Sequence, residues 1–203
     1  MPAALCVLVA ALAAPPTLYS GAHLIPVTGP EIPNGDMLVA EGMIVALGPA
    51  GTVADTQTSL HVVDCSGQVI MPGLICTHSH IGGRGGGDRS GPIQPETRIL
   101  DALDVHSAGF RRAVAGGLTA LNIMPGSGHL SSGQTVYVKL RDARTADDLF
   151  IRDADGNVMG GLKMANGTNS QGGKGFPGTR SKSAALVRQD VESGRPRSQA
   201  SSE

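Results

Sequence analysis

Glycine and proline divide this chain into short apolar segments, and this division limits the folds that the chain can adopt. The 203 residues include 29 glycines and 13 prolines, residue types that mark turns and loops. Hydrophobic residues make up 40% of the sequence and aromatic residues only 2%, so we expect a core of aliphatic side chains. The length accommodates one domain of moderate size or two small ones.

The charge pattern excludes one class of partner. The net charge is −1 and the pI is about 6.6, and no basic stripe interleaved with aromatic residues is present, so we expect no nucleic-acid partner. Cys65 and Cys76 follow a third cysteine, Cys6, near the N-terminus. They could pair in an oxidising compartment, or they are two small buried hydrophobic residues.

Residues 1–16 resemble a secretory signal. Ala3 to Ala14 are apolar, and Ala11-Leu12-Ala13 fits a small-x-small cleavage site. The segment is too short to span a bilayer, and no Lys or Arg precedes Arg84. We expect a periplasmic or secreted protein, otherwise a cytoplasmic one. The alternatives for this segment are a mis-assigned start or a buried N-terminal strand.

Residues 17–72 predict a small antiparallel sheet or sandwich. Apolar runs alternate with turn residues, and Glu41-Gly42 between two runs predicts a tight hairpin. We expect residues 28–36, with Pro33-Asn34-Gly35, to form a turn.

The pattern changes after Pro72, and residues 73–190 predict a parallel α/β sheet. Residues 74–80 form a short continuous apolar strand. A Gly-rich loop follows, then a helical pattern over 97–117, a buried strand at 118–124, a loop at 125–134 and a strand at 135–140. Residues 181–193 predict a helix capped by Ser181 or Ser183, and residues 191–203 a disordered tail.

His78 and His80 stand where the strand after Pro72 ends. Residues i and i+2 of a strand point to the same face, so both imidazoles could reach one metal ion. The C-terminal end of a parallel strand is where α/β folds place their sites. The alternative is a pair of surface histidines at a strand–loop junction.

Several motifs in order resemble the amidohydrolase superfamily, in particular its imidazolonepropionase-like branch. "GQVIMPGLICTHSHIGG" is similar to the first barrel strand, and "AVAGGLTALNIMPGSGHLSSGQTVYVKL" to the second and third strands. "KMANGTN" and "GTRSKSAALVR" resemble further segments of that branch. The resemblance implies the N-terminal part of a composite β-sandwich (17–72), followed by an incomplete TIM-type (β/α) barrel (73–190).

The resemblance also implies roles for individual residues. His78 and His80 match metal ligands of the first strand, and the implied cofactor is a divalent metal, zinc foremost. Cys76 stands where the family commonly has Asp. Lys163 is comparable with the carboxylated lysine that bridges two metals in some branches, or it is a lysine at a strand end with its amine in solvent. No catalytic or substrate-binding residue is assigned.

The implied reaction is metal-dependent hydrolysis of cyclic amide-type or dipeptide carbon–nitrogen bonds in small molecules. A full barrel takes about 250 residues, and no histidine follows His129, so we expect the later ligands to be missing and the isolated chain to be inactive. A complementing chain or a second copy would complete the site. The alternative is a non-catalytic remnant or an interaction fragment, which leaves open whether the chain by itself is an enzyme.

Overall fold

The computed structural model describes residues 15–53, 59–83, 88, 90–171 and 177–194. The chain folds as two units, Met1–Pro72 and Gly73–Glu203. The first fourteen residues, with most of the predicted signal, and residues 195–203 of the predicted tail lie outside the described part. Within the described part, no helix is long and apolar enough to cross a membrane.

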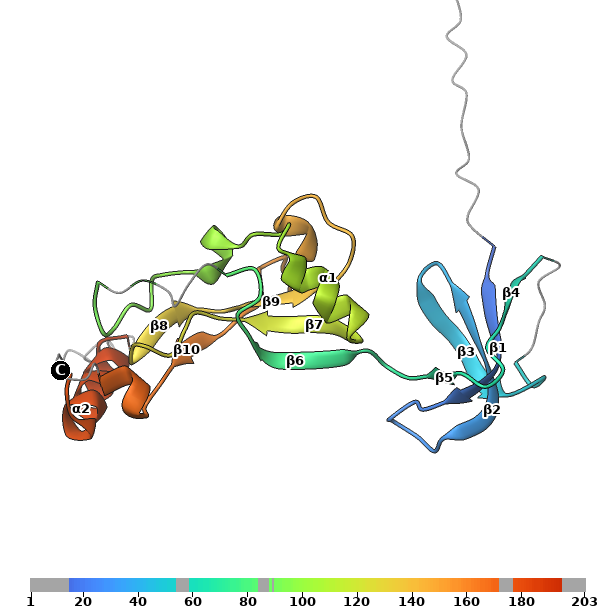
Figure 1. The fold of residues 1–203 in the computed structure, drawn as a ribbon, viewed down its shortest axis with the longest axis horizontal. Coiled ribbons are helices and arrows are strands. Elements are labelled where there is room, and N and C mark those ends of the chain that lie inside the picture. Colours follow the sequence, from blue (N-terminus) through green and yellow to red (C-terminus); the bar gives the residue numbers. More distant parts are fainter. Residues whose placement is uncertain (1–14, 54–58, 84–87, 89, 172–176, 195–203) are drawn as a thin grey trace, which may run out of the picture. The chain divides into compact units, whose positions relative to one another are not determined.

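One five-stranded sheet forms the first unit (Figure 1). Its strands are β1 (Thr17–Leu24), β2 (Ile32–Ala40), β3 (Met43–Pro49), β4 (His61–Asp64) and β5 (Val69–Ile70). β2 is antiparallel to β1, whereas β4 and β5 run parallel to β1. The expectation of a wholly antiparallel sheet is therefore wrong. Alternation in the sequence shows which side chains share a face, but it does not show strand direction.

The hairpin between β2 and β3 turns at Glu41-Gly42, as predicted. Both residues have positive φ, 51° and 76°, as in the type I′ turns whose twist matches that of the flanking strands. Ala40 pairs with Met43 directly across the turn. The sequence therefore located this turn to the residue.

The turn predicted for residues 28–36 is wrong in its second half, because β2 already begins at Ile32. Gly35 permits this course, since a Cβ at that position would lie 2.7 Å from Leu24 Cδ1. Pro33 is tolerated because β3 pairs with β2 only from Gly35 onward, so the N–H that proline lacks is not needed on that side.

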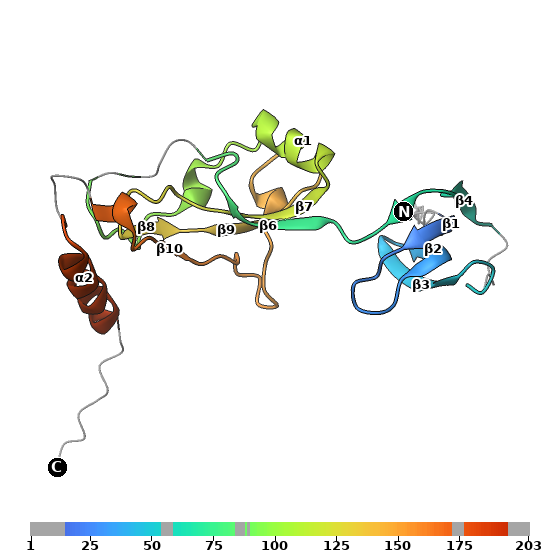
Figure 2. The same ribbon diagram turned by 60° about the horizontal axis from the view of Figure 1, so that its bottom comes forward.

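The described residues of the second unit form two small sheets and two α-helices, with short 3-10 helices between them (Figures 1 and 2). Its elements are β6 (Leu74–Ser79), α1 (Ala108–Ala115), β7 (Leu118–Ile123), β8 (Ser131–Gln134), β9 (Val136–Lys139), β10 (Leu162–Met164) and α2 (Arg180–Ser193). β6 and β7 are parallel, which confirms the predicted strand–helix–strand unit. β9 is antiparallel to β7, and β8 occupies part of the predicted loop, so these two expectations are wrong.

The helix predicted for residues 97–117 is divided in two. A 3-10 helix covers Ile99–Ala102, and α1 begins only after Ser107, whose side chain accepts a hydrogen bond from Gly109 N (3.3 Å). Between them, Asp104 N donates to Gly82 O (2.8 Å). This tertiary hydrogen bond interrupts the helix at a point that the apolar spacing does not reveal.

The core of the second unit lies between α1 and one face of the sheet β6–β7–β9 (Figure 1). Its buried members are Ile99, Phe110, Leu121, Ile123, Val136, Val138, Leu149 and Phe150. The core is mainly aliphatic, as expected, but it includes two of the three phenylalanines in the chain. Cys65 and Cys76 are both free thiols.

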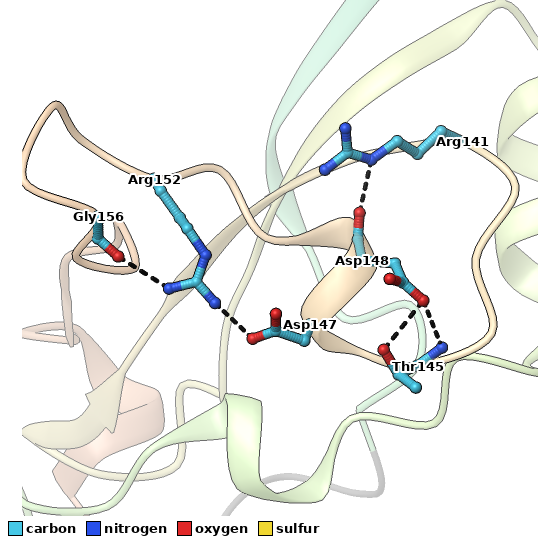
Figure 3. Close-up of polar contacts among 6 residues, drawn as sticks. All are labelled: Arg141, Thr145, Asp147, Asp148, Arg152 and Gly156. Atoms are coloured by element: carbon cyan, nitrogen blue, oxygen red, sulfur yellow. Dashed lines mark hydrogen bonds and ion pairs between the residues drawn. The ribbon is translucent and has the colours of Figure 1, made fainter. Parts of the chain in front are cut away.

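A polar network orders the segment between β9 and β10 (Figure 3). Arg141 Nε donates to Asp148 O, and the Asp148 carboxylate accepts hydrogen bonds from Thr145 N and Oγ1. Arg152 pairs with Asp147 beside it. These contacts hold a segment that has almost no regular strand, and that segment carries Leu149 and Phe150 into the core.

The C-terminal helix α2 starts two positions earlier than the predicted caps allow. Thr179 is the cap, because its hydroxyl accepts a hydrogen bond from Lys182 N (3.2 Å). Ser183 instead donates from its hydroxyl to Thr179 O (2.9 Å). The helix continues to Ser193, so the first three residues of the predicted tail are helical.

Candidate metal centre

His78 is the last residue but one of β6, and His80 directly follows the end of this strand. Met124 N donates to Ser79 O (2.9 Å), and this bond fixes the strand end against the end of β7. Ser79 is buried, whereas His78 and His80 on either side of it are exposed. Buried Ser79 between two exposed histidines is the burial pattern expected when residues i and i+2 share a face.

The two imidazole rings lie close together. Their centroids are 5.2 Å apart, and the ring planes meet at 83°. Two imidazoles that share a tetrahedral zinc ion, each through one Zn–N bond of about 2.0 Å, have centroids about 5 Å apart. Edge-to-face aromatic pairs show the same spacing, so the spacing agrees with both arrangements.

The hydrogen bonding of His80 is a more specific indication of a metal site than the ring spacing. His80 Nδ1 lies 2.8 Å from Met124 O. A carbonyl oxygen only accepts hydrogen bonds, so Nδ1 carries the proton and Nε2 keeps its lone pair. Metal-binding histidines in proteins commonly have this arrangement, in which one ring nitrogen donates to a carbonyl and the other is free to bind the ion.

Lys163 reaches the same site from β10, where it pairs with Gly133 of β8. The positive charge of Lys163 lowers the pKa of His78, with smaller contributions from burial and from His80. The neutral imidazole is the form that binds metals. The structure thus places His78 beside His80, with Lys163 near enough for its charge to act on His78.

The other histidines lie elsewhere. His23 pairs with Glu31 in the first unit (2.9 Å). His129 lies in the loop before β8 with Nε2 buried and unpaired, and its charge contributes to lowering the pKa of Asp88, after the larger effect of the Ser90 hydrogen bonds. In the described ranges, no group of three or more His, Cys, Asp or Glu side chains is placed to hold a metal ion.

The sequence motifs predicted no role for Asn122, a polar residue on the face of the sheet that carries the histidines. Asn122 stands between Leu121 and Ile123, both fully buried in the core, so its side chain points to the opposite face of β7. Its Oδ1 atom is buried without a hydrogen-bond partner. The signal was present as a polar residue inside the apolar run "LTALNIM".

Comparisons with known proteins give relatives for parts of the chain. No family model matches it. A 5-methylthioadenosine/S-adenosylhomocysteine deaminase of Desulforudis audaxviator is 41% identical over 63 residues, which are 31% of this chain and 14% of that protein. An imidazolonepropionase of Yersinia enterocolitica is 37% identical over 96 residues, 46% of this chain and 23% of that protein.

A solved structure extends the likeness to most of the chain. The crystal structure of an amidohydrolase from Thermotoga maritima matches with a TM-score of 0.75 and 28% identity over 87% of this chain. The chain is related to the N-terminal region of the amidohydrolase superfamily. It spans 47% of that amidohydrolase and a smaller share of the curated relatives. Its α/β architecture is the N-terminal, β-rich part of the larger barrel proteins of the superfamily, which confirms the predicted fold class.

Proposed function

We propose that this chain carries the first-strand half of a divalent-metal site, with His78 and His80 as ligands and zinc as the ion. The hydrogen bond from His80 Nδ1 to Met124 O carries the proposal, because it leaves Nε2 as a free donor beside His78. The ring spacing and the lowered pKa of His78 agree with a shared ion. The residues present therefore fit a metal, although they supply only part of its ligands.

The proposed activity is hydrolysis of carbon–nitrogen bonds in small molecules, such as cyclic amides or dipeptides. The relation to the amidohydrolase superfamily supports it, as do relatives named deaminase and imidazolonepropionase. A bound divalent ion supplies Lewis acidity for such a reaction. The chain's own contribution is to hold His80 in the Nδ1-protonated form, which leaves its Nε2 atom free beside His78.

We also propose Lys163 as a bridging ligand in its carboxylated form. Its ammonium group raises the positive charge beside His78 and thus opposes a cation there. Addition of CO₂ to the neutral amine, with release of a proton, converts this group into an anionic carbamate with oxygen donors. Carboxylation of Lys163 thus removes a positive charge that repels the metal ion, and it adds oxygen donors to an incomplete ligand set.

The site needs donors from other residues. A catalytic zinc takes three protein ligands, and the described residues provide two histidines without an acidic or cysteine partner. We propose that a complementing chain or a second copy supplies the remainder, so that this chain alone is inactive. A non-catalytic protein that binds metal weakly is the second candidate, favoured by the same shortage of ligands.

Zinc titration by calorimetry tests the metal proposal. We expect wild-type protein to bind zinc, and His78→Ala and His80→Ala to weaken binding at least tenfold. His61→Ala is the matched control, since His61 is an exposed histidine of the first unit. Wild-type affinity equal to that of His78→Ala would show that the two histidines hold no ion.

An activity assay tests the incompleteness of the site. We expect no measurable hydrolysis of cyclic amides or dipeptides by the purified chain with added zinc. Turnover that disappears in His78→Ala would show instead that the chain is a sufficient enzyme.

Export to the periplasm or the exterior, the alternative being the cytoplasm, is proposed from Ala3–Ala14 alone, and mass spectrometry of the mature N-terminus would test it.

A further inference from the structure

We propose that the carboxamide oxygen of Asn122 is an additional donor to the cation held by His78 and His80. This inference rests on the proposed metal site and adds to it a neutral oxygen from the neighbouring strand. No role for this position follows from the sequence motifs. Three features of the structure carry the proposal: the face on which Asn122 lies, its level along the sheet, and the unpaired state of its oxygen.

The face follows from the packing of β7. Leu121 and Ile123 are 2% and 0% exposed and pack in the core with Phe110 of α1. Successive residues of a strand point to opposite faces, so Asn122 points away from α1. His78 also points away from that core, because the irregularity of β6 between Cys76 and Ser79 breaks the simple alternation: Cys76 packs against the core and Ser79 is buried, whereas His78 between them is exposed.

The position of Asn122 along its strand, relative to His78, follows from the register of the parallel pair β6–β7. Cys76 pairs with Leu121 and Ser79 with Ile123, with an irregularity between the two pairs. Thr77 and His78 therefore occupy the stretch of β6 that faces Asn122. Neighbouring strands lie about 4.8 Å apart, so the side chains of His78 and Asn122 are neighbours on one face.

Asn122 also lies at the middle of its sheet. Its direct partner on β9 is Tyr137, and β7 is the central strand of β6–β7–β9 (Figure 1). The hydroxyl of Tyr137 extends toward Gly161, where a Cβ would lie 3.7 Å from it, and Gly161 stands two residues before Lys163. Asn122 thus lies between β6, which carries the histidines, and β9, whose Tyr137 hydroxyl approaches the segment that leads to Lys163.

The unpaired side-chain oxygen of Asn122 is the atom that would bind the cation. Asn122 Oδ1 is buried and accepts no hydrogen bond from any described residue. A buried acceptor without a partner is destabilising, and leucine or valine would fill the same place without that loss. A carbonyl-type oxygen is a ligand for divalent cations, and a cation between His78 and His80 would supply the missing positive partner.

Two substitutions at Asn122 test the proposal by metal affinity and by thermal stability. Asn122→Asp replaces the neutral oxygen with a charged one and should tighten zinc binding about tenfold, whereas Asn122→Leu should weaken it by about the same factor, as for residues that support a metal site. With EDTA present, Asn122→Leu should melt at a higher temperature than wild type, because it removes the unpaired acceptor. Thr119→Asp is the matched control, since it adds the same charge to β7 about 10 Å away.

The outcomes separate this inference from the metal site itself. If wild type binds zinc but Asn122→Asp and Thr119→Asp have equal affinities, Asn122 is no donor and the histidine site stands. If wild type binds no zinc, both proposals fall. A lower melting temperature of Asn122→Leu in EDTA would assign Asn122 a structural role and overturn the inference. Should Asn122→Asp fail to fold, unchanged zinc affinity of Asn122→Leu overturns it.

Discussion

Asp36 shows how a single buried charge can organise the first unit. Its carboxylate accepts hydrogen bonds from Ser20 Oγ (2.8 Å), Gly21 N (3.0 Å) and Gly51 N (2.8 Å), and the residue is 5% exposed. Three separate segments of the chain are thereby joined at one side chain. We expect Asp36→Ala to lower the free energy of unfolding by about 1–3 kcal/mol, because it leaves two backbone N–H groups without their acceptor. Urea denaturation measures this, and a loss below the error of the fit would contradict it.

The same carboxylate predicts an acid-dependent loss of stability. Burial raises the pKa of Asp36, but the hydrogen bonds from Gly51, Ser20 and Gly21 outweigh burial and set the pKa below its ordinary value of 3.8. A depressed pKa of an acid stabilises the fold above the unfolded-state pKa and ceases to do so as the pH falls through the folded-state value. The difference in unfolding free energy between wild type and Asp36→Asn should therefore shrink below about pH 4. A difference that stays constant down to the acid transition would contradict the assignment.

At the scale of elements, α1 depends on Ser107, the residue that precedes it. The helix has only eight residues, and the Ser107 side chain caps it by accepting the hydrogen bond from Gly109 N. We expect Ser107→Ala to destabilise the protein by about 1 kcal/mol, because α1 carries Phe110 into the core. Ser107→Thr keeps the acceptor and is the control. Equal unfolding free energies for the Ala and Thr variants would show that the cap does not contribute.

The elements also show where sequence patterns stop being informative. The hairpin at Glu41-Gly42 and the parallel pair β6–β7 follow from local turn chemistry and from apolar runs, and both are present. The direction of β9 and the interruption before α1 depend on residues distant in sequence, such as Gly82 bonded to Asp104. No local pattern specifies such a partner.

At the scale of the whole molecule, the sheet face that carries the histidines also exposes apolar side chains. Ile75 is 70% exposed and pairs with Ala120, on the same side as Asn122. Contiguous apolar surface favours association, and the outer edge of β6 pairs with no other described strand. We expect concentration-dependent self-association that Ile75→Lys reduces. Sedimentation velocity measures it, and identical profiles for the two proteins would contradict it; Val62→Lys, on the first unit, is the control.

By itself, the sequence determined which residues form the candidate site and which side of a strand they share. The period of two in a strand is a local property, so His78-Ser79-His80 predicted two imidazoles on one face before any fold was known. Lys163, the first residue of "KMANGTN", was singled out only through a family resemblance, with its distance from the histidines left open.

The tertiary structure alone decided the rest of the site. The approach of Lys163 to His78, the bond from His80 to Met124, and the unpaired oxygen of Asn122 all depend on strand registers between segments that are far apart in the chain. Register is set by how whole faces pack against a core, and a slip of one residue would turn each side chain to the other face. The sequence therefore named the proposed ligands, whereas packing placed the groups around them.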